Sequence, residues 1–552
     1  MSSTTIFAAR KILTMNHSRP AATHVAVRDG RILGVGSLEE LEGWGPHQVD
    51  DRFASKVLMP GLVEGHAHVL EGGFWDFTYV GYHDRRSPDG TLQPGLTSID
   101  AVVERLRAAE AAMTDPNAPL LAWGFDPILF GGQRMTCRDL DRVSATRPVA
   151  VLHASVHLMN VNSALMTRAG ITAATPVTGI ARFPDGEPNG ELQEFAAMYL
   201  AYKVAGGEFF TAPGTERAVW RFGRVAQLAG VTTVADLYND LSDEMVGNLT
   251  AVTADPAFPV RVVSALNGSG HGVDGVEKLR RLVARNTDKL RFGIVKLMTD
   301  GSIQGFSARL KWPGYYNGAP NGIWNTGPEE LRSILAAYHK AGFQAHIHVN
   351  GDEASEAALE VIASVLTETP RPDHRHTLQH CQMADEAQFR SMASLGVCVN
   401  LFANHIFYWG DAHYALTMGP DRANRMDAVG TAKRLGVPFA VHSDAPITPI
   451  GPLFSAWCAV NRRTSGGRVL GGEADRITVE DALRAITLGA AYTLRMDHEI
   501  GSIEVGKRAD FTVLDVDPTE VAPEALKDVP VWGTVLGGTV FQAPGGPGGG
   551  NA

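Results

Sequence analysis

The chain has 552 residues, 44% of them hydrophobic and 20% charged, so it can bury a large core and is not a disordered protein. Its formal net charge of -11 gives no basic footprint for nucleic acid or for an anionic membrane surface. The sequence has no signal-peptide core and no apolar run long enough to cross a membrane. Its four cysteines are scattered without a C-x-x-C pair. We therefore expect a protein of the reducing cytoplasm.

Residues 1–58 consist of short apolar alternations separated by turn residues, and the Asp29-Gly30 pair between two of them predicts a hairpin. Residues 491–542 repeat this strand-and-turn pattern at the other end of the chain. Neither piece can hold a core of its own, so we predict that they combine into one small β-sandwich. The remaining residues, 543–552, are rich in glycine and proline and predict a disordered tail.

Between these ends, residues 59–490 alternate short apolar runs with helical stretches, which predicts an α/β fold, a (β/α)8 TIM barrel. About 160 residues separate the first two runs, so we place an inserted subdomain after strand 1, at roughly 75–215. The eight candidate strand regions are 56–68, 230–238, 258–266, 291–301, 342–352, 376–382, 396–404 and 437–446.

Two histidines one residue apart, His66 and His68, end the first run, in GLVEGHAHVL. Side chains at i and i+2 of a strand point to the same side, and active sites of such barrels lie at the carboxyl ends of the strands. Two neutral imidazoles aimed at one point suit a divalent ion such as zinc. A pair of hydrogen-bonded core histidines would give the same short pattern.

Other strand ends favour the metal hypothesis. His346 and His348 close the fifth run, His380 the sixth and Asp444 the eighth, while Lys296 lies within the fourth. Polar groups are costly inside an apolar barrel unless they are paired or bound to metal. A cationic lysine would sit badly beside metal ions, and a carbamylated Lys296 would resolve that conflict, although spacing alone does not reveal the modification.

The motifs PGLVEGHAH, VKLMTDGS, HVNGD, LQHCQ and HSDAP, followed by GSIEVGKRADFTVLD, resemble the amidohydrolase superfamily, and most closely the amidohydrolase-3 branch that includes N-substituted formamide deformylase. The resemblance covers nearly the whole chain. It implies a metal-dependent TIM barrel with catalytic roles for Asp444, His348 and His380. The metal ligands that it implies are His66, His68, carbamylated Lys296, His348, His380 and Asp444.

Other residues near these motifs are not assigned as metal ligands, or differ from the usual residue of the family. The H-x-x-G-D spacing selects His348 as the ligand and leaves His346 as a supporting residue. His376 and His442 lie one or two strand repeats below the ligands and are interpreted as supporting or structural. Phe306 occupies the position where the branch usually has an arginine, which puts the family's substrate contacts there in doubt. The other substrate-binding candidates are Trp123, His153, His157, His405 and Trp409.

The predicted reaction is hydrolysis of an exocyclic amide, an N-formyl or N-acyl amine of a small molecule, by a metal-activated hydroxide with Asp444 as general base and acid. The expected cofactor is one or two Zn²⁺ ions, with Mn²⁺ or Fe²⁺ as alternatives, together with carboxylated Lys296. A deaminase, a cyclic-imide or carbamate hydrolase, and a noncatalytic binding protein remain alternatives. The expected partners are the amide substrate and further copies of the chain, with a dimer favoured, but neither nucleic acid nor membrane.

Overall fold

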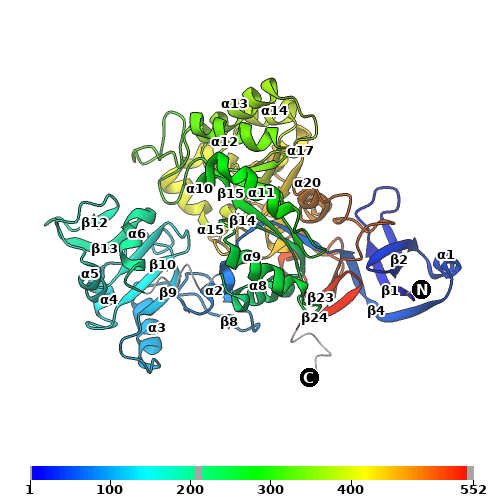
Figure 1. Cartoon of the computed structure of the whole chain (residues 1–552), viewed down its shortest axis with the longest axis horizontal. Coiled ribbons are helices and arrows are strands. Elements are labelled where there is room, and N and C mark those ends of the chain that lie inside the picture. The colour runs from blue at the N-terminus through cyan, green and yellow to red at the C-terminus, as the bar shows by residue number, and fades with distance from the viewer. Residues whose placement is uncertain (1–2, 206–213, 544–552) are drawn as a thin grey trace. The chain divides into compact units, whose positions relative to one another are not determined.

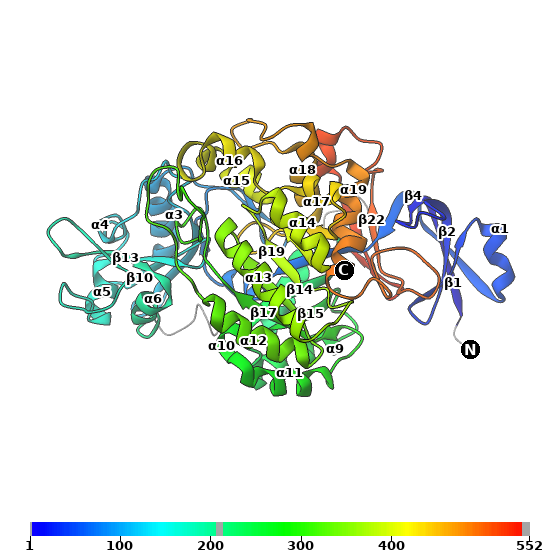
Figure 2. The same ribbon diagram turned by 90° about the horizontal axis from the view of Figure 1, so that it is seen from above.

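The computed structural model describes residues 3–205 and 214–543 (Figures 1 and 2). The chain divides into two compact units. The first consists of Met1–His68, Ala226–Ala445 and Ile450–Ala552, and the second of Val69–Val225 with Pro446–Pro449. The insertion expected at roughly 75–215 falls within the second unit.

The two ends of the chain meet in one seven-stranded sheet of the first unit, where β4 pairs antiparallel with β22. Aromatic rings from both ends pack together, since Phe7 lies 5.6 Å from Phe53 and 6.4 Å from Phe511 between ring centroids. The Asp29-Gly30 turn, with positive φ at both residues, joins β2 to β3. In spatial order the strands are β24 (Thr539–Gln542), β23 (Val531–Leu536), β22 (Phe511–Leu514), β4 (His47–Pro60), β1 (Thr4–Leu13), β2 (Ala21–Arg28) and β3 (Arg31–Gly36).

The rest of the first unit is a parallel eight-stranded barrel, as predicted. An isolated parallel bridge between Ala67 and Ala445 brings the first and last strands together. Each predicted apolar run overlaps one barrel strand, and only β14 and β15 extend beyond their predicted runs, by one residue each. The strands are β5 (Leu62–Ala67), β14 (Val231–Asn239), β15 (Arg261–Asn267), β17 (Ile294–Met298), β18 (Gln344–Val349), β19 (Thr377–His380), β20 (Cys398–Leu401) and β21 (Phe439–Val441).

Helices cover the outer face of the barrel, and Figure 2 shows α12 (Pro328–Lys340), α13 (Asp352–Glu368) and α14 (Glu386–Leu395) outside the strands. Their ends carry local signals. Helix α12 begins with a proline at its first turn. Helix α14 begins at a capping box between Asp385 and Gln388 and ends at Gly396, whose φ of 70° is left-handed. These signals mark where the helices begin and where α14 ends.

The second unit has a six-stranded sheet that is buried on both faces. Alternate residues of β9 enter different cores: Leu121 and Trp123 pack in one, and Leu120 and Ala122 in the other. Helices α3 (Ile99–Ala111) and α5 (Ser163–Ala169) belong to the same unit. The strands, in spatial order, are β12 (Ile180–Arg182), β13 (Pro188–Gln193), β11 (Leu158–Val161), β10 (Val149–His153), β9 (Leu120–Phe125) and β6 (Thr78–Tyr79).

The start of the predicted C-terminal tail is ordered by contact with the terminal sheet. Ala543 is buried and its backbone N–H donates to the carbonyl of Trp532 at 3.0 Å. Residues 544–552 of that tail lie outside the described residues. Across 3–205 and 214–543, no helix has both the length and the hydropathy to span a bilayer.

The barrel and the terminal sheet are joined by a buried ion pair, and its loss should destabilise the fold. Arg261 of β15 donates to the carboxylate of Asp510 at 2.5 Å, and both side chains are almost fully buried. We expect Asp510→Ala to lower the free energy of unfolding by about 3–5 kcal/mol, because it removes the buried counter-charge of a buried guanidinium. The remaining carboxylate neighbour, Asp288, lies 3.8 Å away and is largely exposed. Urea unfolding of the metal-free protein measures this loss. The exposed pair Arg425–Asp421 provides the control, and Asp421→Ala should cost less than about 1 kcal/mol. Equal losses would contradict the assignment.

Candidate metal centre

The site begins at the junction between the first and last barrel strands. The backbone N–H of His68 donates to Ala445 at 2.8 Å, and that of Asp444 donates to His66 at 3.1 Å. This pairing places the Asp444 carboxylate over both imidazoles: its Oδ1 lies 3.2 Å from Nε2 of His66 and 3.1 Å from Nε2 of His68. The two histidines and the aspartate therefore converge, and the i, i+2 spacing accounts for the two histidines lying on the same side.

Three further predicted residues surround this group. Lys296 of β17 is buried, with its Nζ 3.3 Å from Nε2 of His66. Nδ1 of His380 lies 3.8 Å from Oδ2 of Asp444. His348 contacts His380, with ring centroids 4.6 Å apart, but its Nε2 faces the carbonyl of Gly301 at 3.3 Å. His380 and Asp444 both have positive φ, 72° and 52°, a costly conformation that concentrates at functional sites.

A directional chain of hydrogen bonds fixes the tautomer of His66. The carbonyl of Thr493 can only accept, so Nε2 of His346 donates to it at 3.0 Å and Nδ1 of His346 is left as an acceptor. The amide nitrogen of Gln379 donates to that Nδ1 at 2.8 Å. Its oxygen then accepts from Nδ1 of His66 at 2.8 Å and from Asn400 at 3.1 Å. His66 therefore presents an unprotonated Nε2 to the centre, and His346 is a supporting residue.

Glu64 and Asp300 are buried carboxyl groups that bind the segments carrying the site residues. The sequence analysis did not select either of them. Glu64 accepts from the hydroxyl of Ser443 at 2.8 Å and from its N–H at 3.1 Å, which ties strand β5 to the segment after β21. Burial raises the pKa of Glu64 to about 8. Asp300 accepts from the N–H groups of Arg309, Asn350 and Gly351, and burial raises its pKa to about 7. Glu64 lies two residues before His66, the same alternation that selects His68, and this signal could have identified it.

The protonation states at the centre suit a divalent cation. Burial, reinforced by nearby positive charge, holds the pKa of His66 and of His380 well below the usual range, so both imidazoles are neutral. Burial also raises the pKa of Asp444, but the hydrogen bond from His68 and neighbouring positive charges outweigh it and lower that pKa to about 2. Burial lowers the pKa of Lys296 to about 7. Neutral imidazoles and an ionised carboxylate are the forms that bind metal.

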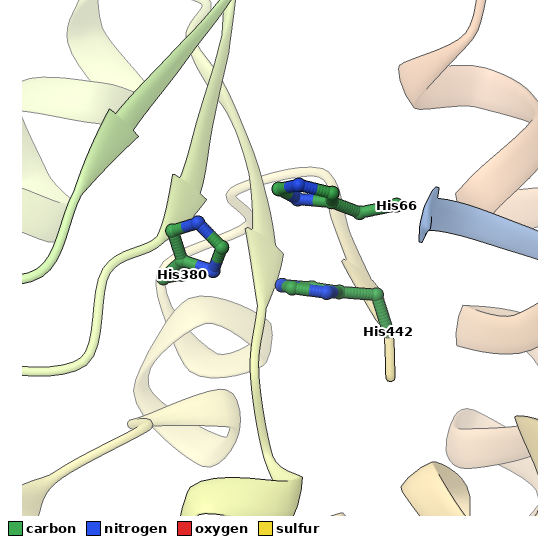
Figure 3. A group of neighbouring side chains, drawn as sticks. All are labelled: His66, His380 and His442. Carbon is green, nitrogen blue, oxygen red and sulfur yellow. The ribbon is translucent and has the colours of Figure 1, made fainter. Parts of the chain in front are cut away.

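The ligand atoms are also close enough to share an ion. Donors on one zinc ion, each at about 2.0–2.2 Å, lie about 3.4 Å apart. Two groups place all their donor atoms within 4.8 Å of one another: His66, His68 and Asp444, and also His66, His380 and His442. Figure 3 shows the second group, with the rings of His66 and His442 lying parallel and His380 facing them. The residues present therefore fit a metal centre.

Three of the substrate-binding candidates lie in the first unit. His405 and Trp409 belong to α15 (Asn404–Ala412), where both are buried and the ring of His405 lies 4.1 Å from that of Phe402. Nδ1 of His405 is 3.6 Å from the buried carboxyl group of Asp427, a residue that no sequence motif selects. Phe306, with φ of 57°, packs against Tyr315.

The other three substrate-binding candidates lie in the second unit, and each contacts a neighbouring side chain of that unit. Trp123 is buried, and the guanidinium of Arg85 lies 4.8 Å from its ring centroid. Nε2 of His153 lies 2.5 Å from Oδ1 of Asn160. His157 pairs with Glu194 at 3.1 Å.

A parallel barrel whose rim gathers imidazoles, a lysine and a carboxylate defines a metal-dependent hydrolase, and comparison with known proteins agrees. The profile of the Amidohydrolase family matches residues 54–542. The chain belongs to this family and is a hydrolytic enzyme.

Relatives resemble the chain over nearly its full length. The protein LONG AFTER FAR-RED 3 of Arabidopsis thaliana is 28% identical over 550 residues, covering 96% of this chain and 89% of that protein. N-substituted formamide deformylase of Arthrobacter pascens is 25% identical over 557 residues, covering 96% of each. An uncharacterized metal-dependent hydrolase from Pyrococcus horikoshii OT3 has the same fold, with a TM-score of 0.73 at 20% identity over 94% of this chain and 99% of that one.

Removing the hydrogen-bond acceptor of His66 should weaken metal binding. We expect Gln379→Leu to reduce zinc affinity by roughly 10- to 100-fold, because His66 loses the partner that fixes its tautomer and ring orientation. Competition with a chromophoric chelator measures the affinity. Asn400→Leu is the matched control, since it removes the other bond to the same oxygen and leaves the His66 contact in place. Unchanged affinity in Gln379→Leu, or an equal loss in both variants, would contradict the role assigned to Gln379.

Proposed function

We propose that this enzyme hydrolyses an exocyclic amide of a small molecule, an N-formyl or N-acyl amine. The observation that carries the proposal is the contact of the Asp444 carboxylate with both histidines of the first strand, at 3.1 and 3.2 Å. The similarity to N-substituted formamide deformylase over 96% of the chain supports an amide substrate of this kind.

Asp444 and His68 form the accessible side of the centre, with side chains 12% and 18% exposed, whereas His66 is 1% exposed. A bound divalent ion supplies Lewis-acid polarisation of the substrate carbonyl and lowers the pKa of a water molecule. The Asp444 carboxylate is ionised at neutral pH, so it can take the proton of the attacking water. The same group then delivers that proton to the leaving nitrogen, so one residue serves as base and then as acid.

Lys296 is suited to carbamylation, and we include the carbamate in the proposed centre. Its amine is buried and has a pKa of about 7, so a large fraction is neutral and nucleophilic at physiological pH. Attack of that neutral amine on CO2 forms an N–C bond, breaks one C–O π bond and releases one proton, so the neutral amine becomes an anionic oxygen donor. With neutral imidazoles, the carbamate and Asp444 together carry two negative charges, which balance one divalent ion. Zinc is the proposed ion because imidazole and carboxylate are ligands that it accepts readily.

A substrate screen tests the reaction class. The metal-reconstituted enzyme should release formate or another carboxylate from N-formyl and N-acyl amines, and both the acid and the amine should be quantified. Carbamates, cyclic imides and amino-substituted heterocycles are included in the same screen. Turnover confined to a cyclic imide, or ammonia release without a carboxylate product, would replace the proposed function with one of the other hydrolases of this fold.

The role of Asp444 predicts a separation of metal binding from turnover. We expect Asp444→Asn to lower kcat by roughly 100- to 10,000-fold, since the amide cannot take the proton from water. The purified variant should retain metal, measured by elemental analysis. His66→Ala is the comparison variant, and it should lose metal as well as activity. A fully active Asp444→Asn enzyme would remove Asp444 from the proton-transfer step.

A further inference from the structure

His442 lies inside the barrel beside the predicted ligands, yet the implied ligand set does not include it. It follows β21, two residues before Asp444, and is fully buried. One ring face stacks on His66, with centroids 4.7 Å apart and planes 18° apart. The other face stacks on Phe402 at 4.9 Å and 24°. Its ring also lies 5.1 Å from that of His380 (Figure 3).

The nitrogens of His442 are not used by the fold. Neither ring nitrogen has a hydrogen-bond partner within the described part of the chain. Two other buried histidines of the barrel differ: His376 accepts from the N–H of Ala345 at 3.0 Å and pairs with His339 at 2.8 Å, and both nitrogens of His346 are bonded. Buried polar groups normally have partners. Packing between two aromatic rings would need only another ring. The two ring nitrogens of His442 therefore indicate that this residue binds something that the protein itself does not supply.

The neighbours of His442 indicate what that ligand is. Nδ1 of His380 likewise has no hydrogen-bond partner among the described residues. His66, His380 and His442 each offer a ring nitrogen, and the three atoms lie within 4.8 Å of one another. The nitrogen that His66 presents to this group is Nε2, which Lys296 approaches at 3.3 Å, since its Nδ1 is bonded to Gln379. Three histidine nitrogens gathered in this way correspond to the three-histidine ligand set that zinc uses in catalytic sites.

We propose that His442 is a ligand of the metal centre, so that His66, His380 and His442 form a second metal position beside that of His66, His68 and Asp444. This inference deepens the proposed function and rests on it for the presence of a metal. Because Nε2 of His66 binds one ion at a time, the two positions share this ligand.

The test uses the full-length enzyme loaded with Co²⁺, whose visible absorption and hyperfine-shifted imidazole N–H signals report the histidine ligands directly. His442→Phe keeps a ring between His66 and Phe402 but removes both nitrogens. We expect it to lose one shifted N–H signal, to change the visible spectrum and to bind Co²⁺ at least about tenfold more weakly. Phe402→Leu is the control, because it disturbs the same stack without removing a nitrogen, and it should leave the signal count unchanged. His442→Gln provides a second variant if His442→Phe does not fold.

An unchanged signal count and spectrum in His442→Phe would overturn the proposal, including the case where only the activity changes, because a bridging water would then explain the imidazole. A wild-type enzyme that binds no divalent metal would overturn both this inference and the metal centre. A wild-type enzyme that binds metal and shows the His442 signal, but cleaves no amide, would leave the inference standing and remove the proposed substrate class.

Discussion

The site depends on how the barrel closes. The first and last strands meet through two backbone hydrogen bonds, from His68 to Ala445 and from Asp444 to His66. The residues that make these bonds also carry the converging side chains, so closure of the sheet and assembly of the site are one event. Glu64 reinforces the same junction by binding Ser443. A one-residue slip at this junction would turn the side chains of the first strand to the opposite face and separate the carboxylate from both imidazoles.

The charges buried around this junction explain why a bound cation would stabilise the centre. Burial favours the neutral form of Lys296, while Asp444 keeps its charge because His68 and nearby positive groups stabilise it. Burial keeps the imidazoles of His66 and His380 neutral by holding the pKa of each well below the usual range. An ionised carboxylate in such an interior is costly without a strong counter-charge. A divalent ion supplies that charge, and a carbamate on Lys296 would balance the remainder.

Sequence patterns predicted the barrel strands and the residues at their ends because both signals are local: an apolar run, a turn, and a polar residue in phase with the strand. The same local signal selected His66, His68, His380 and Asp444. It could not assign Gln379, whose role exists only because His66 and His346 come from other strands. It also could not distinguish His442 from His376, since both lie below the ligands in sequence. Only the three-dimensional contacts show that the ring nitrogens of His376 have hydrogen-bond partners, whereas those of His442 have none among the described residues.

The hydrogen-bond chain behind His66 has a further consequence for the pH behaviour of the centre. Its direction is set at Thr493, whose carbonyl forces the tautomer of His346, and Gln379 transmits that choice to His66. A second proton on His346 would require Gln379 to reverse, which would turn its amide N–H groups toward His66 and Asn400, both donors. Burial, reinforced by the charge of Lys296, lowers the pKa of His346 to about 3, so this reversal does not occur near neutral pH. The tautomer of His66 is therefore insulated from changes of pH around neutrality.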